Sequence, residues 1–378
     1  MANLTVGQHN TLVYVVNEET TSGNTTRPGP GTLKRYDVTT GTKTVIVDIP
    51  NASIESAQIS ADGKWILFTD SDGKLRLVRL DGKGLQTLFC GIDAGAPPQW
   101  SSDQRHIIFS LSDSSKRLDT VYLLTVATGT LQPLLTVSND PKTGSSGYGI
   151  AIGTWLDNSR VYLTDFQNDL PHDRIYILDT SRGPNQSLSS LPVLVNKTFG
   201  DFDSSYDGQR LYVDYGFCEQ GGCFAPSSVT SQPATGGVET TLFNEPRYDV
   251  IGMRVVTASI LLLIIRNDRF FGLSDRSHNG LWKINTNGSG LTRLTSDPTN
   301  QHSYQYSSLN TWTQSPWSNV SRDNGLYALQ TTQVSTLSAD QPADIYTIEY
   351  APLSGGAPTV IASIGDGTTL QIAGWTVM

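Results

Sequence analysis

Residues 56–89 read SAQISADGKWILFTDSDGKLRLVRLDGKGLQTLF and contain four short apolar segments separated by three polar turns that carry glycine. Apolar residues such as Leu75 and Leu77 are spaced by two positions, which is the period of a β-strand. Asp62-Gly63 and Asp81-Gly82 are dipeptides typical of tight hairpin turns. The stretch therefore predicts four consecutive antiparallel strands.

The same order of strands and turns recurs along the chain. Its most regular part is the last hairpin of each copy, which occurs seven times, as DVTTGTKTVIV, RLDGKGLQTLF, TVATGTLQPLL, DTSRGPNQSL, SQPATGGVETTLF, NTNGSGLTRLT and APLSGGAPTVI. The hairpins are separated by roughly 40 to 60 residues, a period typical of propellers and solenoids.

The two ends of the sequence complement each other. After the seventh hairpin one strand remains, TLQIAGWTV at 369–377, while the amino-terminal part begins with NTLVYVVN at 10–17, which reads as a second strand. The first of these resembles the inner-strand segment IAIGTW at 150–155. We therefore predict an all-β fold, a seven-bladed β-propeller of four-stranded antiparallel blades. Its ring is closed by the C-terminal strand pairing with the N-terminal three strands, which removes an open sheet edge.

This interpretation assigns residues 1–378 to a single propeller domain. The expected blades are 369–378 plus 9–50 for blade 1, 54–90 for blade 2, 97–137 for blade 3, 149–196 for blade 4, 197–245 for blade 5, 247–297 for blade 6 and 303–364 for blade 7.

Two of these segments carry a family resemblance. SADGKWILFTDSDGKLRLVRLDGKGLQTLF and GLWKINTNGSGLTRLTSD resemble the blade repeat of the TolB-type, WD-repeat-like propellers, in which an S-x-D-G-K turn precedes the second strand and a D-G-x-x-x-x-L-T hairpin ends the blade. The resemblance implies the propeller fold over nearly the whole chain. These motifs form strand turns and carry no chemistry. TolB-type proteins have six blades and an additional N-terminal α/β domain, so their partner is not transferred to this chain.

Composition and charge exclude several classes of partner. The chain has a formal net charge of −9, and no run of Lys and Arg forms a basic stripe, so we expect no nucleic-acid partner. The longest apolar run, 260–265, is too short to cross a bilayer, so we expect no membrane span. The first ten residues lack the basic and apolar regions of a secretory signal. We expect a bacterial, monomeric protein that is extracytoplasmic or secreted with its leader absent, with a cytoplasmic location as the alternative.

The sequence indicates neither a cofactor nor a metal site. Cys218 and Cys223 flank a Gly-Gly turn, which leaves a disulfide and two free thiols as alternatives. The five histidines are scattered and have no metal-ligand spacing. Two groups of aspartates are interpreted as turn residues, namely Asp70 with Asp72, and Asp201 with Asp203 and Asp207.

Long loops are expected on one face of the propeller, and these loops are the candidate binding region. The richest loop, 266–280, offers aromatic anchors and guanidinium donors suited to carboxylate or sugar contact, namely Arg269, Phe270, Phe271, Arg276 and His278. In the alternative interpretation the two phenylalanines only pin the loop and the charged groups are solvated. His172 falls on the same face.

Three tryptophans end innermost strands and are candidates to line the axial channel, namely Trp155, Trp312 and Trp375. The alternative is that they pack sheet against sheet.

Function is predicted from these loops and from the residue types in them. The sequence holds no G-x-S-x-G nucleophile motif and no cluster of acids, bases or nucleophiles. We predict a non-catalytic binding or scaffold propeller that recognises a protein, peptide or glycan on the face carrying the long loops. The alternative is a carbohydrate-active enzyme, a lyase or glycosidase, with its site in the axial funnel. A third possibility is a structural propeller without a small ligand.

Overall fold

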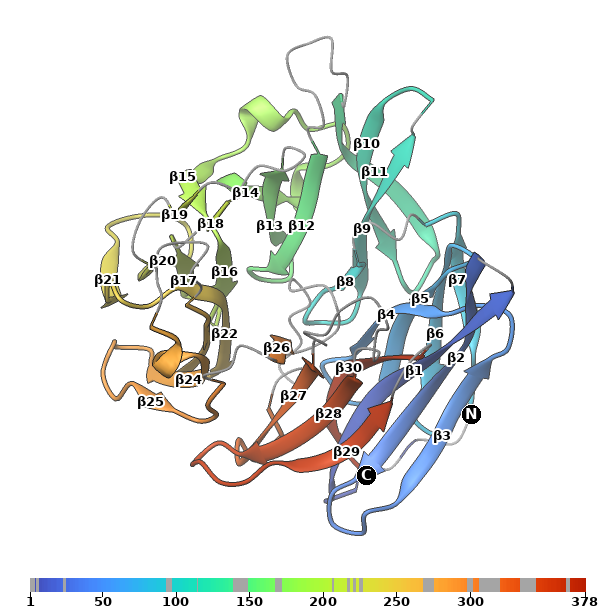
Figure 1. Ribbon diagram of the computed structural model, residues 1–378. Coiled ribbons are helices and arrows are strands. Elements are labelled where there is room, and N and C mark those ends of the chain that lie inside the picture. The colour runs from blue at the N-terminus through green and yellow to red at the C-terminus, as the bar shows by residue number, and fades with distance from the viewer. Residues whose placement is uncertain are drawn as a thin grey trace. The chain divides into compact units, whose positions relative to one another are not determined.

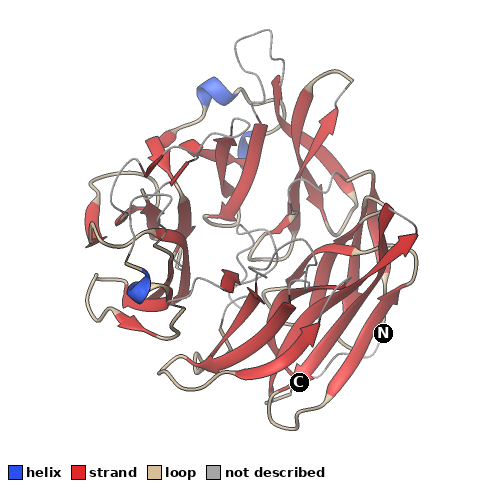
Figure 2. Cartoon of the chain, in the orientation of Figure 1, coloured by secondary structure: helices blue, strands red, loops and turns tan. Residues whose placement is uncertain are grey.

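The computed structural model describes residues 4, 7–22, 25–92, 97–113, 115–138, 149–166, 172–205, 207–215, 218–219, 222–223, 227–267, 275–297, 302–305, 320–333, 345–364 and 368–378. Strands dominate these residues, and the helical elements among them are three short 3-10 turns (Figure 2). These are η2 (Thr180–Arg182), η3 (Leu188–Ser190) and η5 (Arg276–His278).

The strands form seven four-stranded antiparallel sheets, which confirms the predicted seven-bladed β-propeller (Figure 1). The first three blades have the orders β3-β2-β1-β30, β4-β5-β6-β7 and β11-β10-β9-β8. Their strands are β1 (Asn10–Ser22), β2 (Thr25–Asp37), β3 (Lys43–Ile49), β30 (Thr368–Val377), β4 (Ile54–Ile59), β5 (Trp65–Asp70), β6 (Lys74–Arg79), β7 (Gln86–Cys90), β8 (Gln99–Trp100), β9 (His106–Asp113), β10 (Leu118–Thr125) and β11 (Thr130–Ser138).

Blades 4 to 7 have the orders β12-β13-β14-β15, β16-β17-β20-β21, β22-β23-β24-β25 and β26-β27-β28-β29. Their strands are β12 (Gly149–Trp155), β13 (Arg160–Phe166), β14 (His172–Asp179), β15 (Val193–Phe199), β16 (Asp201–Ser204), β17 (Arg210–Asp214), β20 (Ser228–Pro233), β21 (Thr240–Asn244), β22 (Val250–Thr257), β23 (Ile260–Ile265), β24 (Gly280–Asn285), β25 (Thr292–Arg293), β26 (His302–Gln305), β27 (Leu326–Gln333), β28 (Ile345–Pro352) and β29 (Thr359–Ile364). A separate two-stranded hairpin joins β18 (Cys218–Glu219) and β19 (Gly222–Cys223).

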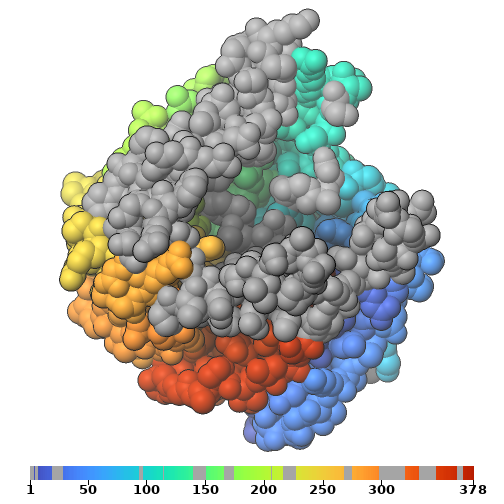
Figure 3. All heavy atoms as spheres, viewed as in Figure 1, coloured from blue at the N-terminus to red at the C-terminus, as the bar shows by residue number. Residues whose placement is uncertain are grey.

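The C-terminal strand closes blade 1, as the sequence predicts. β30 pairs with β1 in an antiparallel register that runs from Asn10 opposite Val377 to Glu18 opposite Thr368 (Figure 1). On the molecular surface the red C-terminal strands lie beside the blue N-terminal strands (Figure 3). The Thr376 hydroxyl also donates to the backbone oxygen of Gly63, at 2.7 Å. The last strand therefore belongs to the sheet of the first strands and is also bonded to blade 2.

Short polar motifs form the turn that precedes the second strand in several blades. In blade 2 the Ser60 hydroxyl donates to Asp62 at 2.6 Å and accepts the backbone N–H of Trp65 at 2.9 Å. Gly63 then adopts a φ of 71°, a left-handed conformation that glycine accepts without steric cost. The same serine–aspartate bond recurs between Ser205 and Asp207 and between Ser321 and Asp323. The S-x-D motif noted in the sequence is therefore a hairpin device.

Burial decreases from the inner to the outer strands of a blade. In blade 6 nearly every residue of β22 is buried, whereas both residues of the outer strand β25 are exposed. The inner and middle strands β22 and β23 of blade 6 are covered on both faces, and the sequence of β23, ILLLII, is accordingly apolar throughout.

The described residues divide into two compact units, one formed by 1–104 and 301–378 and the other by 105–300. The first unit contains a core around Leu33, Ile54 and Phe68, and a second core in which Trp375 packs against Tyr14. The cores of the other unit form around Leu163 in blade 4 and around Met253 in blade 6. No helix among the described residues has the length and apolarity needed to cross a membrane.

Replacing Trp375 by alanine tests the closure of blade 1. The indole is fully buried and meets the Tyr350 ring edge to face at 6.3 Å between centroids, so Trp375→Ala leaves a large cavity. We expect the free energy of unfolding to fall by about 3–5 kcal/mol in urea denaturation. Val360→Ala, at a side chain that is 55% exposed on β29, is the control and should change it by less than about 0.5 kcal/mol. Equal stabilities of the two variants would show that β30 does not hold the sheet.

Candidate functional site

Each blade has one end at which its second strand passes to its third, and we name this the long-loop end. In blade 6 this end is marked by Ile265 opposite Gly280, with residues 266–279 between the two strands. The inter-blade segment 245–249 leads into β22 at the same end, where Val250 pairs with Ile265. Two segments distant in sequence therefore meet at the place where the sequence predicts the richest binding loop.

A buried asparagine holds these segments together. Asn267 is fully buried, and its side-chain oxygen accepts the backbone N–H of Asp249 at 2.9 Å. Its amide nitrogen donates to the backbone oxygens of Arg247 at 2.7 Å and Asp275 at 2.8 Å. Asn279 adds two further bonds to the Asn267 backbone. Both stems of the loop and the inter-blade segment are thus fixed by side-chain amides.

Aromatic rings and guanidinium groups gather on this framework. The ring of Tyr248 lies 4.6 Å from that of His278 and 5.8 Å from that of Trp282, and the Trp282 indole N–H donates to the His278 backbone oxygen at 2.8 Å. Arg247 lies 6.0 Å from the Tyr248 ring, and Arg293 lies 5.6 Å from the Trp282 ring. We name these five residues the Tyr248 cluster.

Carboxylates at the edge of the Tyr248 cluster modulate its positive charge. Glu245 binds Arg247 through two hydrogen bonds, at 2.9 and 3.0 Å, and these bonds lower the pKa of the Glu245 carboxyl. Asp275 caps η5, and the hydrogen bond from Ser277 lowers its pKa; its carboxylate lies 3.6 Å from the His278 ring. The Arg247 side chain nevertheless remains 69% exposed while paired with Glu245.

The structure brings together only part of the predicted site. Arg276 and His278 lie in η5 at the long-loop end of blade 6, and His278 belongs to the Tyr248 cluster. His172 opens β14 at the long-loop end of blade 4, with its backbone opposite Phe199. The His172 side chain and the residues Arg269, Phe270, Phe271 and Trp312 lie outside the described residues.

Two of the predicted tryptophans lie at the opposite end of their blades. Trp155 pairs with Val161 across the short turn between β12 and β13, whereas the long-loop end of that blade is at Phe166. Trp375 pairs with Leu12, whereas in blade 1 the second strand passes to the third after Ser22. Trp375 is also fully buried, and Trp155 packs against the blade 4 core. Trp155 and Trp375 thus contribute to core packing, the alternative given for them, while the lining of an axial channel stays a prediction.

Two inner-strand aspartates also differ from their predicted role as turn residues. Asp201 and Asp203 lie on β16, and their carboxylates accept the backbone N–H groups of Met253 at 2.9 Å and Val255 at 2.8 Å on β22. Arg254, only 2% exposed, lies 3.2 Å from Asp201. These carboxylates connect blades 5 and 6, a role that depends on strands far apart in sequence. Asp207, in contrast, lies in the predicted turn.

Sequence reasoning missed a recurring polar residue at the long-loop end. Five blades place a buried Asp or Asn near the end of the second strand or, for Asn17 in blade 1, at a register shift within it, namely Asn17, Asp70, Asp165, Asp214 and Asn267. Asp70 accepts the Lys74 backbone N–H at 3.0 Å, and Asp165 accepts that of Arg174 at 3.0 Å. The signal was present as an apolar run followed by Asp or Asn, in YVVN, LFTD, YLTD, LYVD and IIRN.

The cysteine pair is placed by its backbone alone. Cys218 and Cys223 are directly opposite each other in the β18–β19 hairpin, while their side chains lie outside the described residues. The disulfide remains a prediction. Cys90 is exposed and free. Among the described residues, no group of three or more His, Cys, Asp or Glu side chains could hold a metal ion.

Comparisons with known proteins identify the fold. No protein-family model matches the chain, and no curated protein matches it in sequence. The chain is similar to the β-propeller domain of the Trilobed protease from Pyrococcus furiosus, with 11% identity, a TM-score of 0.58 and 95% of each chain covered. It is also similar to oligogalacturonate lyase from Vibrio parahaemolyticus, with 12% identity, a TM-score of 0.55 and 80% of each chain covered.

A third similar structure is TolB from Acinetobacter baumannii, with 15% identity and a TM-score of 0.44. The match covers 73% of this chain and spans 62% of the length of that TolB. The predicted resemblance to β-propellers is confirmed at the level of the fold, and these similarities show the fold alone.

Removing the Asn267 amide tests the framework of the long-loop end. Asn267→Ala leaves the Asp249 N–H and two backbone oxygens without their buried partner. We expect a loss on the order of 3 kcal/mol in the free energy of unfolding. Asn244→Ala, at an exposed position on β21, is the control with the same change and should have little effect. If both variants unfold at the same urea concentration, the amide does not hold the segments together.

Asp203 gives the stability a defined dependence on pH. Burial raises the pKa of this fully buried carboxyl from 3.8 to about 7, so between these values the folded chain binds a proton that the unfolded chain releases. The contribution to stability is fully present below about pH 4 and is lost as the pH rises to about 7. For one group this amounts to on the order of 4 kcal/mol.

The free energy of unfolding is measured at pH 5 and at pH 8 for three proteins, namely the unmodified chain, the Asp203→Asn variant and the Asp207→Asn variant. We expect a smaller decrease in Asp203→Asn, because its amide does not titrate. Asp207→Asn should keep the full decrease, because hydrogen bonding from Ser205 lowers the pKa of Asp207 and moves its titration out of this range. An unchanged slope in Asp203→Asn would contradict the assignment.

Proposed function

We propose that this chain is a non-catalytic binding propeller that recognises a protein, peptide or glycan through the Tyr248 cluster. The observation that carries the proposal is the grouping of three aromatic rings with two exposed arginines on a hydrogen-bonded framework. Aromatic rings supply contact area at a small entropic cost, and guanidinium groups bind carboxylate and hydroxyl oxygens in a fixed geometry. A surface of this kind suits recognition of an extended ligand with acidic or hydroxyl groups.

The rigidity of the framework supports the proposal. The segments that carry Arg247, Tyr248 and His278 are joined by the bonds of Asn267, so the cluster keeps its arrangement before a ligand binds. Preorganisation reduces the entropic cost of association. We expect this recognition to take place outside the cytoplasm.

The alternative function, a carbohydrate-active enzyme, requires a different arrangement. Glycosidases place two carboxyl groups about 5–10 Å apart on either side of the scissile bond. The inner-strand carboxylates of Asp201 and Asp203 are buried and accept backbone N–H groups of β22, so they hold strands together. Because these two carboxylates are already engaged with backbone N–H groups, they favour binding over catalysis as the role of the chain.

The proposal is tested by screening the full chain on glycan and peptide arrays and measuring any ligand by calorimetry. We expect Arg247→Ala and Arg293→Ala each to weaken binding by about tenfold, because each removes a guanidinium beside an aromatic ring. The control Arg182→Ala removes an arginine that is 61% exposed and paired with Asp179 in blade 4, and it should leave the affinity unchanged.

Two outcomes would contradict the proposal. One is a ligand that binds the doubly substituted Arg247→Ala, Arg293→Ala protein as tightly as the unmodified chain. The other is conversion of an oligosaccharide into unsaturated products, monitored by ultraviolet absorbance, or into hydrolysed products, monitored by the release of reducing ends. Either result would establish a carbohydrate-active enzyme instead.

A further inference from the structure

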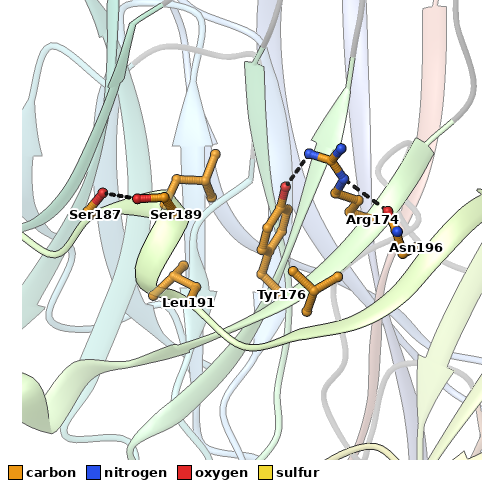
Figure 4. Close-up of a pocket in the computed structure, with 8 residues that line it drawn as sticks. Arg174, Tyr176, Ser187, Ser189, Leu191 and Asn196 are labelled. Atoms are coloured by element: carbon orange, nitrogen blue, oxygen red, sulfur yellow. Dashed lines mark hydrogen bonds between the residues drawn. The ribbon is translucent and has the colours of Figure 1, made fainter.

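Blade 4 carries an open pocket of about 770 Å³ that is separate from the Tyr248 cluster. Its walls come from β14, β15 and the segment that contains η3, with lining residues Arg174, Tyr176, Ser187, Leu188, Ser189, Leu191, Val193 and Asn196. The volume falls within the range of about 300–1,000 Å³ that is usual for small-molecule sites. Figure 4 shows Arg174 and Asn196 at one side of the pocket, Ser187, Ser189 and Leu191 at the other, and Tyr176 between them.

The floor of the pocket is apolar and firmly packed. Leu191 is 6% exposed and Tyr176 is 3% exposed, and both belong to the blade 4 core, with Leu188 packed against it. Val193 stands at the rim with 48% of its surface exposed. An apolar ligand group placed here would cover aliphatic side chains without disturbing the core.

One charged side chain lines the pocket, and it is held in place. The Arg174 Nε donates to the side-chain oxygen of Asn196 at 3.1 Å, and its Nη1 donates to the Tyr176 hydroxyl at 3.4 Å (Figure 4). Arg174 and Asn196 are also directly opposite each other in the β14–β15 ladder. The Arg174 side chain is nevertheless 46% exposed, so the guanidinium is both oriented and accessible.

A buried carboxylate beneath the pocket orders this arrangement. Asp165, at the end of β13, accepts the Arg174 backbone N–H at 3.0 Å and the Tyr176 hydroxyl at 3.1 Å. Its distance to Arg174 Nη1 is 3.9 Å, longer than the roughly 2.7–2.9 Å of a charge-assisted hydrogen bond. Burial raises the pKa of Tyr176, so its hydroxyl stays protonated and keeps this orientation.

We infer that this pocket binds an amphipathic monocarboxylate, a small ligand with one carboxylate on a compact apolar body. The carboxylate would face the Arg174 guanidinium, a planar donor suited to carboxylate oxygens, while the apolar body would cover Leu188, Leu191 and Val193. The serine hydroxyls and the Asn196 amide add neutral polar contacts. This inference goes beyond the proposed function, since it concerns another blade and another class of ligand.

The surroundings disfavour two other classes of ligand. A phosphate dianion would bring two negative charges close to Asp165 with a single guanidinium to balance them. A sugar ring commonly stacks on an exposed aromatic face, but the Tyr176 ring is buried and the accessible floor is aliphatic.

The test compares two probes of nearly the same shape, phenylacetate and phenylacetamide, titrated into the full chain by ligand-observed NMR. We expect phenylacetate to bind about tenfold more tightly, because only the carboxylate forms a charge-assisted bond with Arg174. Arg174→Gln should abolish this preference. Arg182→Gln, the same change at an exposed arginine outside the pocket, should preserve it.

A second variant keeps the test valid if Arg174→Gln unfolds. Val193→Glu removes an apolar contact for both probes and adds a negative charge at the exposed rim, so it should weaken phenylacetate more than phenylacetamide. Val238→Glu, at a side chain that is 86% exposed outside the pocket, is its matched control. The inference is overturned if the two probes bind equally, if neither binds at millimolar concentration, or if Val193→Glu behaves like Val238→Glu. None of these results bears on the Tyr248 cluster.

Discussion

The antiparallel ladder between β30 and β1 is the constraint on which the architecture of blade 1 depends. Without β30 this blade would have three strands, and the buried faces of Leu12 and Tyr14 would lose Trp375 and Ile372 as neighbours. The ladder also brings Gln371 and Thr376 against the backbone of blade 2. One strand thus completes a sheet, closes a core and connects two blades, which explains why its residues are almost all buried.

Polar side chains help to define where strands end. Apolar packing between strands does not by itself fix these positions. A buried Asp or Asn at the end of the second strand accepts a backbone N–H from a neighbouring segment, as Asp70 does from Lys74 and Asn17 does from Ile54. In blades 4 and 6 this residue lies beneath the two sites described above, Asp165 under the pocket and Asn267 under the Tyr248 cluster. The device that ends a strand also supports the side chains around the loop that follows.

The fold could be predicted from the sequence because its signals are local and repeated. Strand alternation, the D-G turns and the terminal hairpins each depend on a few adjacent residues, and the unmatched strand at 369–377 indicated the closure. The site was less predictable because it depends on residues that meet only after folding. Loop 266–280 was identified from its composition, but Tyr248, Trp282 and Arg293 come from three other segments. Trp155 and Trp375 lie on innermost strands, as the sequence predicts, but composition does not reveal the end of the blade at which each lies.

The closure of blade 1 also determines how the protein responds to mechanical load. His9 and Met378 exchange two backbone hydrogen bonds, at 3.0 and 3.1 Å, so these two residues lie side by side at one end of the β1–β30 ladder. Tension applied between these two residues acts parallel to the hydrogen bonds of the β1–β30 pair and breaks these bonds one after another. A shear geometry would load all of these bonds together. Under traction from both ends, the first element to detach is therefore the strand that completes the sheet.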